Sequence, residues 1–236
     1  MREAMRTYHL FFPRKWLVGC VYILYPLCLI VGDVLMCRTG MVLLYMLSIV
    51  MAGCTVVTVE CVLDTFMFSG IGAKECSSLE YVKSSAKGIQ LLERALTVDG
   101  IRRLVTTFVI AAGMRVAELQ FINTILQEDI EIEEGMSAFG SLSYIAVALL
   151  LVLVTELGFC ITRRIKNGYA SMVMLFAEVA VVCVLINLVL NYSTWLVVGL
   201  LAVVTIAVLI WERKGLIKKV RESYYDAGCE EVPQTV

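Results

Sequence analysis

The chain has 236 residues, of which 60% are hydrophobic and 17% are charged, with a formal net charge of −1 and a mean hydropathy of +0.85. This composition lies well to the apolar side of a typical globular chain, which excludes an ordinary water-soluble domain. No nucleic-acid partner is expected, and the partner implied first is a lipid bilayer.

Six apolar runs follow one another along the chain, each near the ~20 residues that a helix needs to cross ~30 Å of hydrocarbon. They predict an all-α, polytopic membrane protein with six transmembrane helices, located in the cell membrane as a multi-pass protein. The runs cover residues 16–36, 41–63, 104–126, 141–162, 169–190 and 195–211.

The chain accordingly divides into three parts. Residues 1–15 form a cytoplasmic or interfacial segment in which Tyr8, Phe11 and Phe12 precede basic residues, and they lead into a first run that reads as an uncleaved signal anchor. Residues 16–212 form the six-span transmembrane domain. Residues 213–236 form a cytoplasmic tail whose first part continues the last helix.

Lys and Arg in the loops set the predicted orientation, because acidic residues contribute little to the positive-inside rule. Of the 20 basic residues, four lie in the N-terminal segment, six in residues 64–103, three in residues 163–168 and five in the tail. Only Arg38 lies in an opposite loop, and the loop after the third run is acidic. Both termini are therefore predicted to be cytoplasmic.

The connection over residues 64–103 is long for a chain that otherwise turns tightly. Ser77 and Glu80 have the spacing of a capping box, which predicts a short helix over 78–85. Apolar positions after Gly88 predict a second amphipathic helix that leads into the third span. These cytoplasmic helices either rest on the lipid headgroups or dock a cytoplasmic partner.

Polar residues within the spans are costly, so they usually face a partner or an aqueous cavity. Arg115 and Glu118 are three residues apart, and either they form a salt bridge or their helix lines a polar pathway or subunit interface. Near the span ends, Asp33, Glu60, Asp64 and Glu156 are expected to be solvated at the boundary or to snorkel. The intramembrane polar candidates are Arg115, Glu118, Asn123 and Glu178.

Templates for catalysis and metal binding are absent from the sequence. It has no phosphate-binding loop, no GxSxG elbow and no HExxH helix, and His9 is its single histidine. The nine cysteines form no CxxC pair, and most lie in apolar runs where thiols behave as small hydrophobes. We expect no enzyme activity, no catalytic residue, and no cofactor or metal on this chain.

The topology resembles the membrane subunit of a type-2 ABC exporter, an ABC-2-type permease. The shared features are six spans, both termini inside, an amphipathic segment before span one and an enlarged cytoplasmic connection between spans two and three. Only residues 191–194 separate the last two runs, whereas larger members of that family insert re-entrant helices there.

The resemblance implies a transmembrane subunit that pairs with a second membrane subunit and with a P-loop ATPase, which would hold ATP and Mg. The substrate would be a lipid, a peptide or another amphipathic molecule. A coupling helix in the 64–103 connection would dock the ATPase. The matching residues are Lys74, Ser77, Leu79, Glu80, Tyr81, Val82 and Lys83.

Two other classes of function stay open. The first is an ion-gradient-driven secondary transporter or channel that uses Arg115, Glu118 and Glu178. The second is a non-transporting membrane scaffold or accessory subunit, and an intramembrane enzyme based on carboxylates alone is a further, remote reading.

Overall fold

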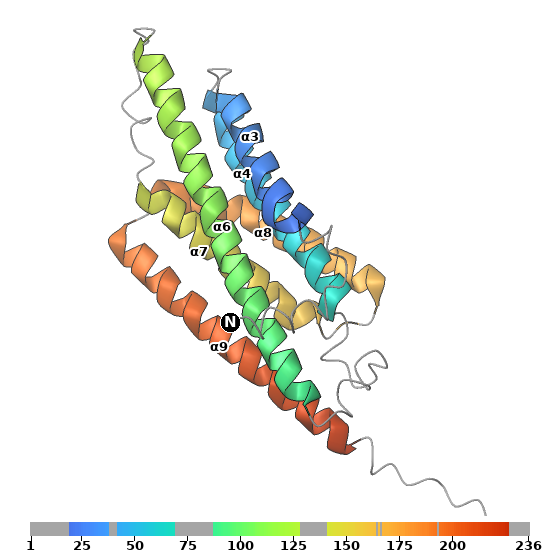
Figure 1. Ribbon diagram of the computed structural model, residues 1–236. Coiled ribbons are helices and arrows are strands. Elements are labelled where there is room, and N and C mark those ends of the chain that lie inside the picture. The colour runs from blue at the N-terminus through green and yellow to red at the C-terminus, as the bar shows by residue number, and fades with distance from the viewer. Residues whose placement is uncertain are drawn as a thin grey trace, which may run out of the picture.

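The structure is a computed structural model that describes residues 19–37, 42–68, 87–127, 141–163, 165, 167–192 and 194–226. These residues form the helices drawn in Figure 1. The helices are η1 (Cys20–Leu24, a π-helical turn), α3 (Tyr25–Cys37), α4 (Val42–Phe68), α6 (Gly88–Gln127), α7 (Ser141–Thr162), α8 (Gly168–Tyr192) and α9 (Trp195–Asp226).

Four of these helices, α4, α7, α8 and α9, are long and apolar enough to cross a membrane. The chain is therefore a helical, multi-pass membrane protein. The first and third predicted spans correspond to η1 with α3, which together form a shorter apolar stretch, and to α6, which carries charges along its length. Six spans and the cytoplasmic placement of both termini stay predictions.

The helix bounds agree closely with the predicted runs where apolar residues alone define them. The fourth run, residues 141–162, is the whole of α7. By contrast, α6 and α9 continue well beyond their apolar runs, because charged side chains at these ends are also good helix formers. The amphipathic helix expected after Gly88 is thus the first part of one 40-residue helix.

Helix α7 holds the bundle together, since it packs against α4, α6, α8 and α9. Its neighbours bury small and β-branched residues against it, and Gly53 of α4 lets Ile186 of α8 approach closely. Although a short turn joins α8 to α9, both pack mainly on α7 (Figure 1). A short connection therefore does not make α8 and α9 each other's main neighbours.

The outer faces of α8 and α9 are strongly apolar and exposed. Phe176 on α8 and Leu196 on α9 are 73% and 85% accessible, which suits surroundings of hydrocarbon and not of water. The polar side chains gather inside the bundle instead, mostly toward the end where α6 begins.

Candidate functional site: a buried ion network and its pocket

Eight charged side chains from four helices form one buried network near the end of the bundle where α6 begins. None of the eight is more than 9% accessible. Each of the acids contacts at least one arginine, so each has a charged partner without water. The members are Glu60 and Asp64 of α4, Asp99, Arg102 and Arg103 of α6, Glu156 of α7, Arg163 directly after α7, and Glu212 of α9.

Arg102 joins α6 to α4. Its two terminal nitrogens donate to the two carboxylate oxygens of Glu60 at 2.9 and 2.5 Å, a bidentate geometry. Its Nε also donates to Asp99 Oδ1 at 3.1 Å, one turn back on the same helix. Because Asp99 lies three residues before Arg102, both are on the same face of α6. Asp99 therefore binds Nε of the guanidinium group while the two terminal nitrogens reach α4.

Arg103 has the most central position of the three arginines and is 1% accessible. It donates through Nη2 to Asp99 at 2.5 Å and through Nη1 to Glu156 of α7, while its Nε lies 3.4 Å from Glu60 Oε2. A single side chain therefore ties α6 to both α4 and α7.

Arg163 closes the network on the other side. Its Nε and Nη2 donate to the Asp64 carboxylate at 2.9 and 2.5 Å, and Nη1 donates to Glu212 of α9. The turn after α7 is in this way fixed to α4 and to α9 at once.

Phe159 lies between two of these cations. The guanidinium carbons of Arg103 and Arg163 are 4.1 and 5.1 Å from the centroid of its fully buried ring. The electron-rich face of an aromatic ring attracts cations, and this attraction offsets part of the repulsion between the two like charges.

Charge balance in the network favours the acids. Five carboxylates face three guanidinium groups, so two negative charges are left over when all the groups are ionised. Surplus charge out of water is expensive, and a proton or a bound cation must compensate it.

Six of the eight groups lie outside the predicted spans, and for two of them, Asp99 and Arg163, the ionisation follows from their surroundings. Burial alone would raise the pKa of Asp99, but Arg103 and Arg102 outweigh it and hold that pKa below its ordinary value. Burial likewise works against the charged form of Arg163, yet Asp64 and Glu212 raise its pKa above the usual value. Both groups are thus kept in their charged forms.

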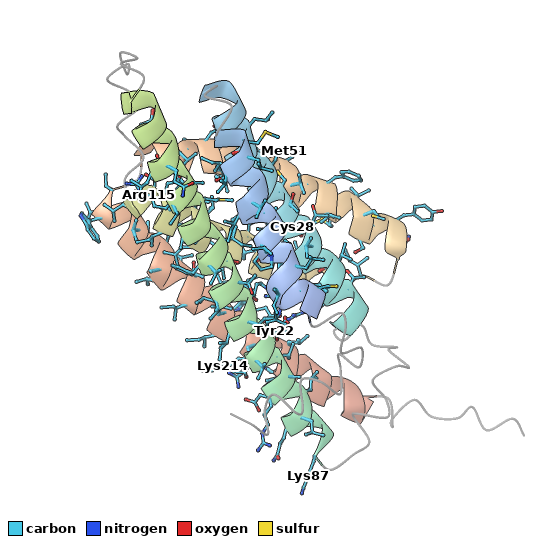
Figure 2. All side chains as sticks on the ribbon, turned by 45° about the horizontal axis from the view of Figure 1, so that its top comes forward. Tyr22, Cys28, Met51, Lys87, Arg115 and Lys214 are labelled. Carbon is cyan, nitrogen blue, oxygen red and sulfur yellow. The ribbon has the colours of Figure 1, made fainter. Side chains whose placement is uncertain are left out.

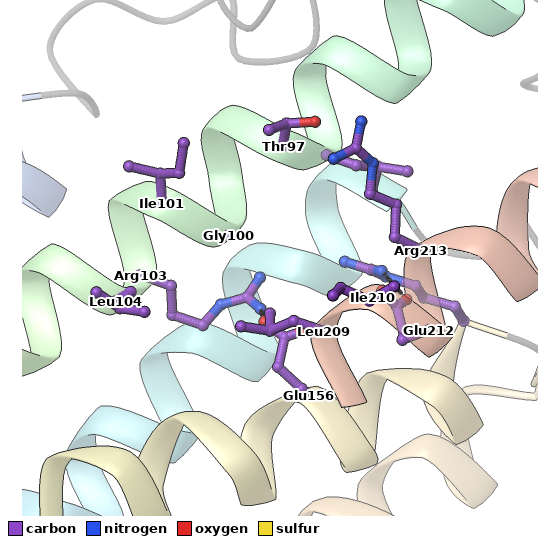
Figure 3. A pocket seen from close by; sticks show the side chains of 12 residues that line it. Thr97, Gly100, Ile101, Arg103, Leu104, Glu156, Leu209, Ile210, Glu212 and Arg213 are labelled. Carbon is purple, nitrogen blue, oxygen red and sulfur yellow. Dashed lines mark hydrogen bonds and ion pairs between the residues drawn. The ribbon is translucent and has the colours of Figure 1, made fainter. Parts of the chain in front are cut away.

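A pocket of about 230 Å³ opens beside the network between α6 and α9 (Figure 3). Its walls are mainly aliphatic, and Gly100 of α6 contributes backbone only. The charged groups lie on its inner side. The lining residues are Leu96, Thr97, Gly100, Ile101, Arg103, Leu104, Glu156, Arg163, Leu209, Ile210, Glu212 and Arg213.

Arg115 and Glu118 lie further along α6, and Figure 2 places Arg115 toward the end opposite Lys87. The Arg115 guanidinium donates to the Glu118 carboxylate, which confirms that the two meet on one helix face. Arg115 also lies over the ring of Tyr144, 5.9 Å from its centroid. The structure thus supports the salt-bridge reading, and it leaves a pathway or interface role untested.

Glu178 of α8 is brought between α4 and α7 and is 6% accessible. Cys61 donates to its Oε2 at 3.0 Å, while Oε1 has no hydrogen-bond partner among the described residues. Gly158 of α7 packs directly against this carboxyl group, because a Cβ added there would overlap the Glu178 oxygens. Within the described part of the chain, this buried carboxyl group therefore receives one hydrogen bond, from a thiol.

Several expectations from the sequence are wrong. Glu60, Asp64 and Glu156 are buried in ion pairs and are neither solvated at the boundary nor snorkelling. Asp33, expected at a solvated boundary, is 3% accessible and accepts a hydrogen bond from Ser48 at 2.5 Å. In each case a neighbouring helix supplies the polar partner that the sequence alone assigned to water or headgroups.

Sequence reasoning missed Asp99, Arg102, Arg103, Arg163 and Glu212 as site residues. A signal was nevertheless present, because each of the four helices carries charges within a few turns of the same predicted boundary. Charges of opposite sign at equal depth on adjacent helices favour pairing, since that satisfies both at once.

The predicted docking residues lie outside the described residues, namely Lys74, Ser77, Leu79, Glu80, Tyr81, Val82 and Lys83. Asn123 lies on α6, but its side chain is outside the described part. Among the residues with described placement, no group of three or more His, Cys, Asp or Glu side chains is arranged to hold a metal ion.

Comparisons with known proteins give no relative: no family model, no curated protein and no solved structure matches this chain.

Proposed function

We propose that this chain is the transmembrane subunit of an ATP-driven exporter, which moves a lipid, a peptide or another amphipathic substrate. ATP and Mg would be held by a separate P-loop ATPase docked at residues 64–103, and a second membrane subunit would complete the complex. The chain itself would hydrolyse nothing.

The observation that carries the proposal is the attachment of the first part of α6. Residues 88–103 belong to the long connection between the second and third spans, and they are helical. At ~1.5 Å per residue, they lengthen the helix of the third span by roughly 24 Å. Arg102 and Arg103 fix this helix to α4 and α7, and Arg163 extends the network to α9.

This attachment allows the first part of α6 to act as a lever on the other helices. Removing one partner from a buried ion pair costs about 3–5 kcal/mol, so a force on the start of α6 would move the joined helices together before it pulled the network apart. A partner that changes shape on the cytoplasmic side could in this way rearrange the whole bundle.

The first test is isolation of the native complex in mild detergent. We expect a P-loop ATPase to co-purify with the full chain, and intact complexes that persistently lack one would contradict the proposal.

The second test addresses docking. Replacing Leu79, Tyr81 or Val82 with Asp is expected to uncouple ATP hydrolysis from transport while the helical content stays unchanged. Unchanged coupling in all three variants would remove the docking assignment.

Glu178 favours a second candidate, an ion-gradient-driven transporter. A protonatable carboxyl group in the middle of a predicted span, with one unpartnered oxygen, is a common element of proton pathways. Proton flux in liposomes that contain this chain alone, abolished by Glu178→Gln, would favour this candidate over the exporter. Absence of flux from the parent chain would remove it.

A further inference from the structure

The pocket between α6 and α9 combines two features that the proposed transport function does not use. Its mouth is aliphatic, with Ile101 and Ile210 being 56% and 49% accessible on the outer surface of the bundle. Its inner side is formed by Glu156 and Glu212 together with Arg103 and Arg163, all four being members of the network whose carboxylates outnumber its arginines (Figure 3). An apolar entrance that leads to a charged interior fits an amphipathic ligand.

The sign of the ligand's charge follows from how the arginines are engaged. Five of the six guanidinium nitrogens of Arg103 and Arg163 already donate to a carboxylate oxygen, and the sixth, Arg103 Nε, lies 3.4 Å from Glu60 Oε2. A phosphate or carboxylate headgroup would have to compete for these donors and would add to a negative surplus. An ammonium group would instead bring donors to the carboxylates and offset that surplus.

Arg213, at the rim of the pocket, adds little attraction for an anionic ligand. It donates to Glu93 at 2.9 Å, and this pair is 39% and 40% accessible, so its charge is already balanced in an exposed place. Charge complementarity therefore favours a cation throughout the pocket.

We propose that this pocket binds a cationic amphiphile, a single ammonium headgroup with a linear alkyl chain and without a phosphate. The headgroup lies against Glu156 and Glu212, and the chain passes between Leu96 and Leu209 toward the exposed isoleucines. A volume of about 230 Å³ holds the headgroup and the first part of such a chain, while the rest extends along the apolar surface. This binding does not depend on the proposed exporter activity.

Gly100 offers a way to fill the pocket without touching a charge. A Cβ at this position would meet only Leu209 at 3.9 Å, an ordinary contact, so the helix can accept a side chain that then occupies the pocket. Gly199 on α9 is the matched control, because nothing lies within 4 Å of its added Cβ and it does not line the pocket.

The experiment uses the full chain in phosphatidylcholine nanodiscs with a dodecylamine that carries a photoactivatable diazirine on its chain. After illumination, labelled peptides are mapped by mass spectrometry. We expect labelling within residues 96–104 and 209–213, with unlabelled dodecylamine competing about tenfold better than dodecanol or dodecanoate, a difference of about 1.4 kcal/mol.

Gly100→Leu is expected to reduce this labelling about tenfold, and Gly199→Leu to leave it unchanged. Should Gly100→Leu fail to fold, Ile210→Trp fills the pocket from the α9 side and carries the same expectation. Glu212→Gln is expected to weaken labelling by the diazirine dodecylamine. The weak competition by dodecanol, which has no charge, should stay unchanged.

Three results would overturn the proposal. The first is equal competition by dodecanoate, which would show that charge sign does not matter. The second is undiminished labelling in a folded, pocket-filled variant. The third is loss of labelling when phosphatidylethanolamine replaces phosphatidylcholine, which would assign the pocket to the phosphatidylethanolamine headgroup, an ammonium that carries a phosphate.

Discussion

The two ends of the bundle hold their charges in different ways. Toward the start of α6, Arg102, Arg103 and Arg163 each reach other helices, and the partners are 42 to 99 residues away in the chain. Toward the opposite end, Arg115 pairs with Glu118 one turn away on the same helix. The first arrangement fixes helices to one another, whereas the second only neutralises a charge within one helix.

This difference assigns the two ends different mechanical properties. The network end resists separation of α4, α6, α7 and α9, because parting them would leave charges buried and unpaired. At the Arg115 end, the ion pair of Arg115 with Glu118 lies within α6 and does not join two helices. The network end is thus the natural pivot of any motion of the bundle.

The largest effect is expected for Arg103→Ala, which tests the contrast between the two ends of the bundle. It leaves Asp99, Glu156 and Glu60 without their central partner, and we expect a loss of about 3–5 kcal/mol in unfolding free energy. Unfolding in mild detergent followed by circular dichroism measures it. Glu156→Gln tests the same contact from α7 and is expected to cost less, and a loss below about 1 kcal/mol for Arg103→Ala would contradict the pivot.

A second prediction concerns Glu178, which lies between the two ends. Gly158→Ala places a methyl group where the Glu178 carboxyl lies, so overpacking is expected to cost about 1–3 kcal/mol. Gly199→Ala is the matched control, with open space around its Cβ and an expected change within about 0.5 kcal/mol. Thermal unfolding of both variants in the same detergent compares them, and equal effects would contradict the close packing at Gly158.

A third prediction follows from the lowered pKa of Asp99. Because its folded-state pKa lies below the unfolded value, its stabilising contribution is fully present above about pH 4 and is lost as the pH falls toward the folded pKa. Each pKa unit of difference corresponds to about 1.4 kcal/mol. Unfolding measured across acidic pH should show a smaller slope in Asp99→Asn than in the parent, and an unchanged slope would show that Asp99 is not the group responsible.

The smallest effect is expected at the other end. The Arg115 side chain is 24% exposed and pairs with one carboxylate, but Glu118 is only 2% exposed, so Arg115→Ala leaves one buried acceptor and should cost about 1–2 kcal/mol. If this variant destabilises the chain as much as Arg103→Ala, the contrast between the two ends does not hold.

Local rules explain what could be read from the sequence. The apolar run over residues 141–162 predicted α7 because a span depends on composition and length alone. The contact of Arg115 with Glu118 was also predictable, since i,i+3 neighbours on a helix face each other.

Prediction of the network would have required information that no single helix contains. Asp99 looked like a residue of an exposed polar face, and Glu60 and Asp64 looked like boundary carboxylates. Their burial depends on Arg102, Arg103 and Arg163 arriving from other helices, and on α7 placing Phe159 among them. Pairing across helices depends on how the helices are arranged, and periodicity along one helix does not encode that arrangement.

The position of Glu212 bears on how the protein is built in the membrane. Glu212 belongs to α9, the last helix to leave the ribosome among those described, and it pairs with Arg163 from the turn after α7. Until α9 is inserted, Arg163 lacks this acid and the pocket lacks the wall that Leu209 and Ile210 provide. Completion of the network is therefore a late step of biogenesis, and before α9 is in place Arg163 is held by Asp64 of α4 alone among its partners in the network.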